Sequence, residues 1–576
     1  MKKVLACLTV CCAVGAVADD VIDPRVRSYV APVRVMWVSP HSPSSQVERA
    51  EVLLSRRWGQ IPEGRFPQGS GCRLVNNGAP ASLLLDFGRE IHGGLQIGVG
   101  AVNGRASSPK PDRVRVRMGE SVAEAMAELG ERGACNDHAL RDSVVELPRF
   151  GYRTFGDSGF RFVRIDLLDK TSITVEFVRA VSVMRPMKRL GSFRCSDERL
   201  NRIWKTAADT LHLCCQEYIW DGIKRDRLVW QGDMHPEICS ILRVFGPEAR
   251  DVVQASLDYM RDTTPSDKWM NTMPAYTLWW IRCQHDWWFF TGDDAYLKQQ
   301  HRYLSEVIAN LDKYIGKDNK CTLNGFLDWP TQHNKPAVKA GMQALMLTAY
   351  RNAAELARRL GDTALASRCD AGAARLAAYR PKWENSKAAA AMLSLAGLAD
   401  SQEMANHLAD GGAAGVSTFY GYYMMEARAR SGDVQGAMDT IRDYWGGMLD
   451  MGATSFWEDF NIAWTNNAFR IDQLPVAGKK DIHGDYGEFC YKGFRHSLCH
   501  GWSSGPAAWM IDHVLGITPL TPGGTKVSVK PFLGSLDWAE GTFPVHGGVL
   551  KVSCRKDGQG RVQTSVSAPR GVEVVE

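Results

Sequence analysis

Several features that define other classes of protein are missing from this sequence of 576 residues. The cysteines after residue 18 include no C-x-x-C pair, which argues against a zinc ribbon or a thioredoxin-type site. No stretch in the same part of the chain reaches the roughly 20 apolar residues that span a bilayer. Lysine and arginine form no cluster and the formal net charge is only +5, so nothing indicates a nucleic-acid partner.

The motifs of serine hydrolases and zinc proteases are also incomplete. Residues 501–505 have the letters G-x-S-x-G, but no predicted strand precedes them, as a nucleophile elbow requires. His496 and His500 stand four residues apart, yet the glutamate of the zinc-protease motif does not follow His496. We therefore expect structural or ligand-contact roles for these two histidines, and no metal or organic cofactor.

The N-terminus has the pattern of an export signal. Lys2 and Lys3 precede an apolar stretch over 4–17, and Ala16-Val17-Ala18 fits a small-x-small cleavage site. A cleavable signal peptide over residues 1–18 is expected, with an uncleaved anchor as the alternative. The mature protein would then be secreted or periplasmic, where disulfides are possible.

Hydrophobic periodicity divides the remaining chain into three parts. Residues 113–117 and 160–165 alternate with period two, which predicts antiparallel strands and a β-sandwich over 19–190. Helical spacing begins after Ser196, a predicted N-cap, and defines a helical domain over 191–516. Strand patterns return in a small C-terminal β-sandwich domain over 517–576.

Three Gly-Asp pairs punctuate the helical domain, at Gly292-Asp293, Gly361-Asp362 and Gly432-Asp433. Glycine supplies the left-handed residue that ends one helix, and aspartate can begin the next. The spacing predicts successive helical hairpins, as in an open solenoid or a closed α/α barrel. No repeated sequence motif of the solenoid kind is present, which favours a closed (α/α)6 barrel.

Acidic and aromatic residues recur together at predicted helix ends, in residues 221–237, 326–330 and 456–460. This combination suits a sugar site, because an indole stacks on the apolar face of a pyranose while carboxylates bond its hydroxyls. Taken singly, each tryptophan is more often a core residue and each acid a cap or an ion pair.

The first cluster is the sharpest. Its near-helical spacing predicts one helix face, entered from a loop that contains Asp221 and Gly222, with members Asp226, Trp230, Asp233 and Glu237. Arg225 and Arg227 flank Asp226, so a surface ion-pair cluster is the alternative; they would also lower the aspartate pKa unless burial outweighs them. A cation between Asp233, His235 and Glu237 would require a loop, since helical spacing separates His235.

Residues 221–233, DGIKRDRLVWQGD, resemble the signature of the α-L-rhamnosidase-type six-hairpin glycosidases, which begins Asp-Cys-Pro-x-Arg and ends Leu-Gly-Trp-x-Gly-Asp. Four further motifs agree in order along residues 80–576: Gly191–Asp197, Phe326–Trp329, Ala453–Glu458 and Ser497–His500.

The resemblance implies a general acid at Asp226 and a general base at Glu458 in an inverting mechanism. It implies sugar-binding roles for a further set: Asp221, Arg225, Trp230, Asp233, Asp328, Trp329, Trp457 and His500. The three tryptophans of this set, Trp230, Trp329 and Trp457, are candidates for the contact with the C6 methyl of a deoxy sugar.

The sequence departs from the family pattern at several positions. Gly222-Ile223 replaces Cys-Pro, Val229 replaces a glycine, Cys499 replaces an asparagine, and Asp226 stands where glutamate is common. We expect an exo-acting hydrolase that removes terminal α-L-rhamnose from a glycan or glycoside. The alternatives are a phosphorylase or unsaturated-uronide hydrolase on the same architecture, for which Lys224, Arg225 and Arg227 would offer a basic pocket, and a catalytically silent glycan-binding relative.

Overall fold

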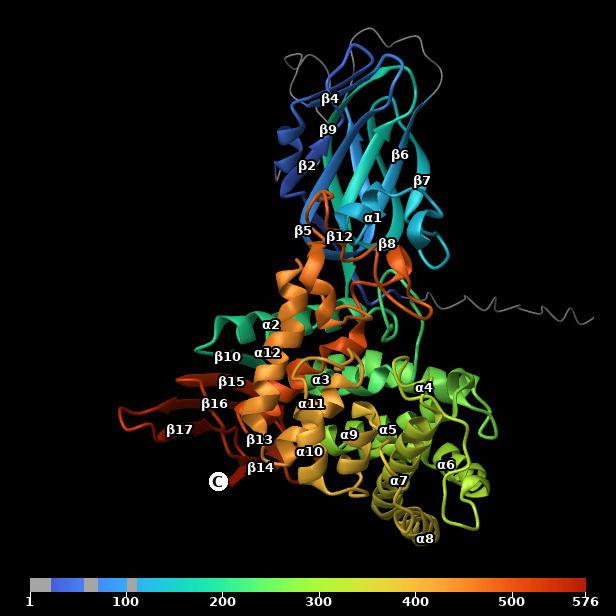
Figure 1. The fold of residues 1–576 in the computed structure, drawn as a ribbon, viewed down its shortest axis with the longest axis vertical. Helices are drawn as coiled ribbons and strands as arrows, with labels where there is room; N and C mark the ends of the chain where they lie inside the picture. The colour runs from blue at the N-terminus through green and yellow to red at the C-terminus, as the bar shows by residue number, and fades with distance from the viewer. Residues whose placement is uncertain (1–21, 56–70, 101–110, 576) are drawn as a thin grey trace, which may run out of the picture.

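The computed structural model describes residues 22–55, 71–100 and 111–575. The expected signal peptide over 1–18 lies outside them. In this part of the chain, none of the helices combines the length and the apolar character that crossing a membrane requires. All twelve cysteines described here are free thiols. The molecule has several domains, with a helical core and sheets at both ends of the chain (Figure 1).

The N-terminal strands form one hydrogen-bonded network with the path β3-β4-β9-β5-β8-β6-β7, to which β1 adds at β9 and β2 at β5. The period-two segments lie in strands as expected, because alternate residues such as Val114 and Val116 enter a core of their own. The strands are β1 Val26–Val30, β2 Arg34–Val38, β3 Ser45–Glu48, β4 Cys72–Asn76, β5 Ala81–Val99, β6 Asp112–Gly119, β7 Asp142–Leu147, β8 Gly151–Leu167 and β9 Ser172–Met184, with the short helix α1 Val122–Met126 after β6.

The helical region begins one residue later than expected. Asp197, and not Ser196, caps the first long helix, because its carboxylate accepts the backbone N–H groups of Arg199 and Leu200. The helices are α2 Glu198–Cys214, α3 Met234–Val244, α4 Arg250–Thr263, α5 Pro274–Thr291, α6 Asp294–Leu311, α7 Lys335–Arg359, α8 Thr363–Ala377, α9 Lys387–Leu395, α10 Ser401–Ala409, α11 Gly421–Arg430, α12 Val434–Asp450 and α13 Pro506–Trp509.

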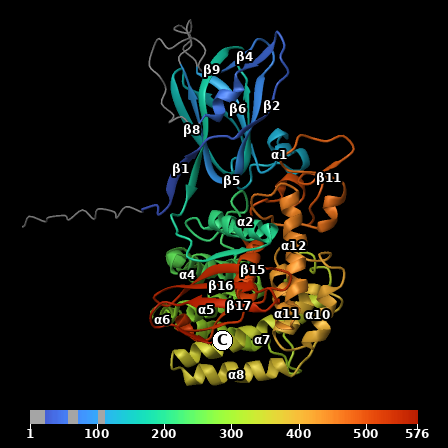
Figure 2. The same ribbon diagram turned by 90° about the vertical axis from the view of Figure 1, so that its left-hand side faces the viewer.

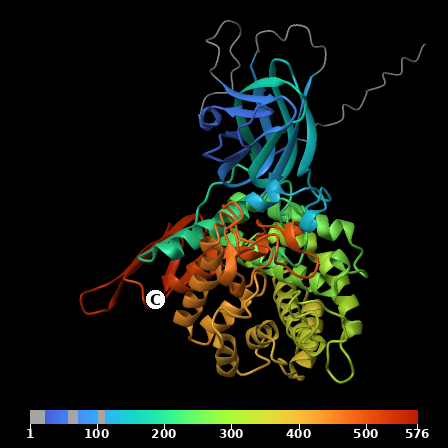
Figure 3. The ribbon, with the colours of Figure 1, turned by 45° about the horizontal axis from the view of Figure 1, so that its top comes forward.

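The three Gly-Asp pairs act as predicted. Gly292, Gly361 and Gly432 all have positive φ. Each following aspartate accepts a backbone N–H at the start of the next helix. Among the helices, α3 contacts α5, α5 contacts α7, α7 contacts α9, α9 contacts α11, α11 contacts α13, and α13 contacts α3. Figure 3 shows the green, yellow and orange helices following one another around the lower part of the molecule.

The C-terminal strands flank the helices on one side (Figure 2). Strand β10, Ser192–Cys195, precedes the first helix in sequence but pairs with β15 in the C-terminal sheet. Phe193 and Leu550 belong to the same hydrophobic core as the helices. The strands after the helices are β13 Ile517–Pro519, β14 Lys526–Val529, β15 Trp538–Val545, β16 Gly548–Lys556, β17 Val562–Ser567 and β18 Glu573–Val575, while β11 Ala468–Phe469 and β12 Lys480–Asp481 lie in the loops before α13.

The N-terminal sheet and the helical region meet through buried polar contacts. Arg161 on β8 pairs with Asp86 at 2.9 Å and donates to the carbonyl oxygen of Gly452 at 2.9 Å. Nearby, the backbone N–H of Glu90 donates to Thr454. These contacts hold the lower end of the sheet against residues 452–454, a few residues before Glu458.

Replacing the buried arginine of this junction should destabilise the protein. Arg161→Ala leaves Asp86 with only the half-exposed Arg34, at 2.7 Å, as a cationic partner, and the loss of buried hydrogen bonds to a charged group costs about 1.5–3 kcal/mol. We expect urea denaturation to show a fall of this size in the free energy of unfolding. Arg302→Ala, which removes an exposed pair with Glu306, is the control and should change stability by less than about 0.5 kcal/mol. Equal effects of the two substitutions would contradict a junction held by Arg161.

Candidate active site

The segment from Asp221 to Asp233 is a loop, which corrects the helix predicted for its acidic residues. The carboxylate of Asp221 accepts the backbone N–H groups of Asp226 at 2.8 Å and Leu228 at 3.0 Å. These bonds fold the chain back on itself, so helical spacing does not apply until α3 begins at Met234. Asp226 and Trp230 are therefore placed by the loop and not by a helix face.

Asp226 is paired with its neighbour Arg225. Nε and Nη2 of Arg225 lie 2.9 and 2.7 Å from Oδ1 of Asp226. Burial by itself would raise the pKa of Asp226, but the charge and hydrogen bond of Arg225 outweigh it, so the pKa falls below its usual value. The effect of Arg225 on the pKa of Asp226 thus exceeds the opposing effect of burial. Asp226 is therefore ionised in the free protein.

Glu458 shares the same arginine. Nη1 of Arg225 lies 3.7 Å from Oε2 of Glu458, whose side chain is only 6% exposed. The backbone N–H of Ser497 donates to that Oε2 at 3.0 Å, and the N–H of Glu458 donates back to the carbonyl of Ser497 at 2.9 Å. Two carboxylates more than 200 positions apart in the sequence therefore meet at one guanidinium group.

A buried residue from the N-terminal part of the chain, Glu120, supports the backbone next to Glu458, and no sequence motif marks it. Glu120 Oε2 accepts the backbone N–H of Leu498 at 2.6 Å and pairs with Lys224 Nζ at 2.9 Å. Burial raises the pKa of Glu120 to about 7, although Lys224 opposes the shift. Lys224 also donates to the carbonyls of Phe494 and His496, so its charge is committed to this buried network.

Asp233 and His500 form a buried pair close by. His500 Nε2 lies 3.2 Å from Asp233 Oδ2, and the hydroxyl of Tyr276 donates to Oδ1 at 2.9 Å. Burial disfavours the charged imidazolium, but the hydrogen bond to Asp233 and the nearby carboxylates of Glu458 and Asp221 raise the pKa of His500 to about 9. Burial also raises the pKa of Asp221, to about 7.

Two tryptophans expected to contact sugar are partly exposed beside this cluster. Trp230 lies edge-on to Tyr276 at 6.0 Å, and Trp329 stacks on Phe489 at 5.6 Å. Trp457 differs from the expectation. Its side chain is fully buried, and its ring packs against Phe460 and lies edge-on to His496, so it has no face left for a sugar. It is a core residue that supports the chain at Glu458.

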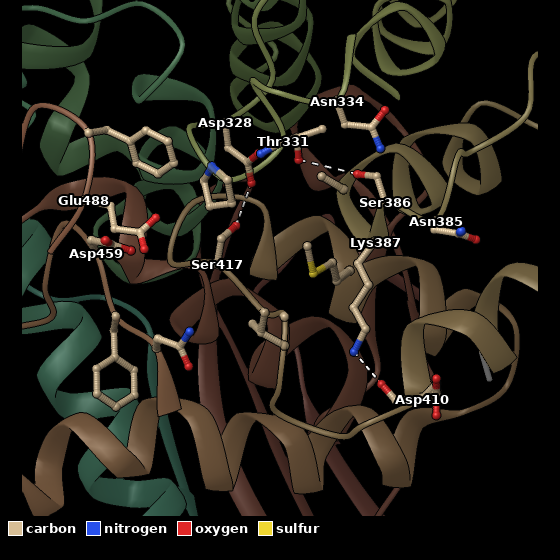
Figure 4. A pocket seen from close by; sticks show the side chains of 18 of the residues that line it. Asp328, Thr331, Asn334, Asn385, Ser386, Lys387, Asp410, Ser417, Asp459 and Glu488 are labelled. Carbon is tan, nitrogen blue, oxygen red and sulfur yellow. Dashed lines mark hydrogen bonds between the residues drawn. The ribbon is translucent and has the colours of Figure 1, made fainter. Parts of the chain in front are cut away.

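Asp328 lies in a neighbouring pocket of about 430 Å³. Its carboxylate accepts the N–H of Thr331 at 3.0 Å and the hydroxyl of Ser417 at 2.9 Å (Figure 4). Asp459, next to Glu458 in the chain, also lines this pocket, and burial together with the charge of Glu458 raises its pKa to about 7. Asp459 belongs to the acidic and aromatic cluster at 456–460, but the family motif at 453–458 ends at Glu458 and assigns Asp459 no role.

The pocket combines polar groups and aromatic rings. Figure 4 places Asp459 and Glu488 on one side and Lys387 with Asp410 on another. Its aromatic walls are Phe460, Trp464 and Phe489. Such a lining suits a polyhydroxylated ligand, which needs both stacking surfaces and hydrogen-bonding groups.

The cation site considered for Asp233, His235 and Glu237 does not form. Nδ1 of His235 bonds the hydroxyl of Tyr423 at 2.7 Å, and Nε2 bonds Asp286 at 3.1 Å, away from the other two residues. Glu237 is fully buried and lacks a hydrogen-bond partner in the described structure, and burial raises its pKa well above the usual value. Burial thus disfavours the anionic form that a cation ligand requires.

The pair of Asp233 and His500 should make the free energy of unfolding fall as the pH becomes alkaline. The pKa of His500 is about 9 in the folded protein, against 6.5 for an unperturbed histidine. A raised pKa stabilises the fold fully below pH 6.5, and this contribution disappears as the pH rises through about 9; the shift corresponds to about 3 kcal/mol.

Urea denaturation at pH 6.5 and pH 9.5 measures this loss. The control is the double variant Asp233→Asn/His500→Gln, which lacks both charges and should not show this contribution. Parallel pH curves for the two proteins would contradict the assignment.

Comparison with known proteins identifies the family. The model of the bacterial alpha-L-rhamnosidase six-hairpin glycosidase domain matches residues 188–514. An alpha-L-rhamnosidase of Formosa agariphila is 24% identical over 185 residues, which are 31% of this chain and 18% of that protein.

Solved structures show the same fold. A rhamnosidase of the GH78 family from Bacillus sp. GL1 superposes with a TM-score of 0.71 and 21% identity, covering 91% of this chain and 55% of that one. The rhamnosidase of Klebsiella oxytoca with rhamnose bound has a TM-score of 0.63 and 18% identity, covering 85% of this chain and 96% of that one.

This chain thus spans little more than half of the Bacillus protein and a smaller share of the Formosa protein. The family model nevertheless covers more than half of the chain and includes both carboxylates that meet at Arg225. The chain belongs to the bacterial α-L-rhamnosidase six-hairpin glycosidase family.

Proposed function

We propose that this protein is an exo-acting α-L-rhamnosidase that inverts the anomeric centre, with Asp226 as general acid and Glu458 as general base. The observation that carries the proposal is the contact of both carboxylates with Arg225. Given those two contacts and the width of one planar guanidinium, the carboxylate oxygens lie about 9 Å apart or less. This limit accommodates the roughly 6.5–9.5 Å that leaves room for a water molecule in inverting enzymes.

In the reaction, protonated Asp226 gives its proton to the glycosidic oxygen as the bond to the anomeric carbon breaks. Water attacks that carbon from the opposite face and loses a proton to Glu458. The backbone N–H of Ser497 and the guanidinium of Arg225 orient Glu458. Asp221, Asp233 and His500 supply hydrogen bonds to sugar hydroxyls, while Trp230 and Trp329 supply apolar surface, one of them to the C6 methyl.

The proposal includes the barrel, the N-terminal sandwich, the domain bounds and the signal peptide. The ring of contacts from α3 through α13 and back to α3 supports a closed (α/α)6 barrel over an open solenoid. The bending of long strands such as β5, which has register shifts along its pairing, supports an N-terminal sandwich over 19–190, followed by domains over 191–516 and 517–576. A signal peptide over 1–18 would place the enzyme in the periplasm or outside the cell.

A phosphorylase would require free cationic groups for phosphate. Lys224 is bound to Glu120 and Glu124, Arg225 to Asp226, and Arg227 to Asp157. These three side chains are therefore engaged with carboxylates, which favours water over phosphate as the acceptor. The ionised state of Asp226 favours a second candidate, a glycan-binding relative without turnover, and the following experiment separates the two.

Removing either carboxyl should abolish hydrolysis. We expect Asp226→Asn and Glu458→Gln to lower kcat for a nitrophenyl α-L-rhamnoside by at least about 10³-fold with circular dichroism unchanged. NMR of the wild-type product should show the inverted anomer first. The controls Asp262→Asn and Glu306→Gln change exposed acids and should keep full activity. Binding of rhamnosides without turnover by the wild type would instead identify a silent relative.

The pocket beside Asp328 should hold the part of a glycan beyond the terminal sugar, because it adjoins Glu458 through Asp459. Trp464 is one of its aromatic walls. We expect Trp464→Ala to raise KM about tenfold for a rhamnose-terminated oligosaccharide, equivalent to about 1.4 kcal/mol of binding, and to leave KM for a nitrophenyl rhamnoside unchanged.

The matched control is Trp538→Ala on the C-terminal strand β15, which should alter neither value. If Trp464→Ala raises KM equally for both substrates, the pocket does not distinguish the longer glycan.

A further inference from the structure

One residue of the N-terminal part of the chain reaches Asp226. His138 lies in the loop before β7, and its Nε2 is 3.4 Å from Oδ1 of Asp226. Its Nδ1 is 3.2 Å from the backbone carbonyl oxygen of the same residue. The imidazole therefore contacts both the main chain and the carboxylate of Asp226, across 88 positions of sequence.

The partners of the ring determine where its proton sits. A carbonyl oxygen can only accept, so Nδ1 carries hydrogen and donates to Asp226. Nε2 accepts from Nη2 of Arg495 at 3.3 Å, because a guanidinium can only donate, and it also faces Oδ1 of Asp226 at 3.4 Å. It is therefore the position that gains a proton when the bond to Arg495 opens toward Asp137. The tautomer is assigned from these contacts.

The ring is held in place by charged neighbours. Arg495 pairs with Asp137 at 2.9 Å and donates to the carbonyl of Cys490 at 2.7 Å. Asp137 lies 3.6 Å from His138 Nε2. The charged groups facing the imidazole are thus Asp137, Asp226 and Arg495, and the charge of Arg495 is balanced by Asp137.

We propose that His138 is a proton relay that acts through Asp226, taking a proton from solvent and passing it to this carboxylate in each catalytic cycle. The inference rests on the proposed function. A free protein in which Asp226 is an ionised partner of Arg225 must regain a proton on Asp226 before the next glycosidic bond can be cleaved. The side chain of His138 is 25% exposed, so it has access to water, and that of Asp226 is 17% exposed.

The proton balance is closed. Protonated His138 gives the hydrogen on Nε2 to Asp226, which becomes a carboxylic acid while the imidazole becomes neutral. Asp226 then gives this proton to the leaving oxygen as the C–O bond breaks, and Glu458 takes a proton from the attacking water. Solvent restores the proton of His138 and removes that of Glu458.

The test compares leaving groups. A 2,4-dinitrophenyl rhamnoside needs almost no protonation of its leaving oxygen, whereas a methyl rhamnoside needs it fully. His138→Asn keeps a donor toward the carbonyl of Asp226 but cannot transfer a proton. We expect kcat/KM to fall about 10²-fold for the methyl substrate and less than about threefold for the dinitrophenyl substrate. The pH dependence of kcat for the methyl substrate should also change in shape.

The control is His301→Asn, which removes a surface histidine paired with Asp362 and should leave both substrates unaffected. If His138→Asn lowers kcat/KM equally for the two substrates, the relay is overturned and His138 has a structural role only. Unchanged turnover of both substrates would also overturn the relay. A wild-type protein that hydrolyses neither substrate would overturn the proposed function itself, an outcome that differs from either of these.

Discussion

The proposed active site depends on one buried cation. Arg225 contacts Asp226 with two of its nitrogens and Glu458 with the third, and its own side chain is nearly inaccessible to solvent. Two carboxylates brought this close in a protein interior repel each other, and a planar guanidinium relieves the repulsion because it presents donors in several directions. The arginine therefore holds the two groups together and also sets the ionised state of Asp226, so proton supply becomes a requirement of the site.

The N-terminal sheet contributes to this site directly. Glu120 holds the backbone of Leu498, which follows the residue whose N–H orients Glu458, and His138 contacts Asp226. Lys224, within the signature loop itself, bonds Glu120 and so ties the two parts of the chain together. The sheet domain consequently supports the proposed catalytic residues, and the buried contacts of Arg161 near Gly452 hold it against the helical region.

Burial separates the acids of the site into different states. Asp221 and Asp459, with pKa values of about 7, and Glu237, with a pKa well above its usual value, all lack a direct cationic partner. Asp226 has such a partner and stays ionised. Asp221 and Asp459 are therefore partly protonated at neutral pH, beside the ionised Asp226.

The sequence by itself determined most of the helices and strands and the family. Period-two segments such as 113–117 became strands, and the three Gly-Asp pairs ended and began helices, because both depend on local backbone geometry. The motif at 221–233 pointed to the correct family. Local patterns failed where distant contacts act: the bonds of Asp221 turn a predicted helix into a loop, and packing buries Trp457 completely.

Only the tertiary structure decided which residues meet. Strand β10 pairs with β15 in a sheet whose other strands lie more than 300 residues further along the chain. The protonation of Asp226 depends on burial and on Arg225 together, and no pattern in the sequence measures burial. His138 and Glu120 carry no motif at all. Their roles follow from the three-dimensional contact between two parts of the chain, since electrostatic and hydrogen-bonding interactions depend on distance in space and not along the sequence.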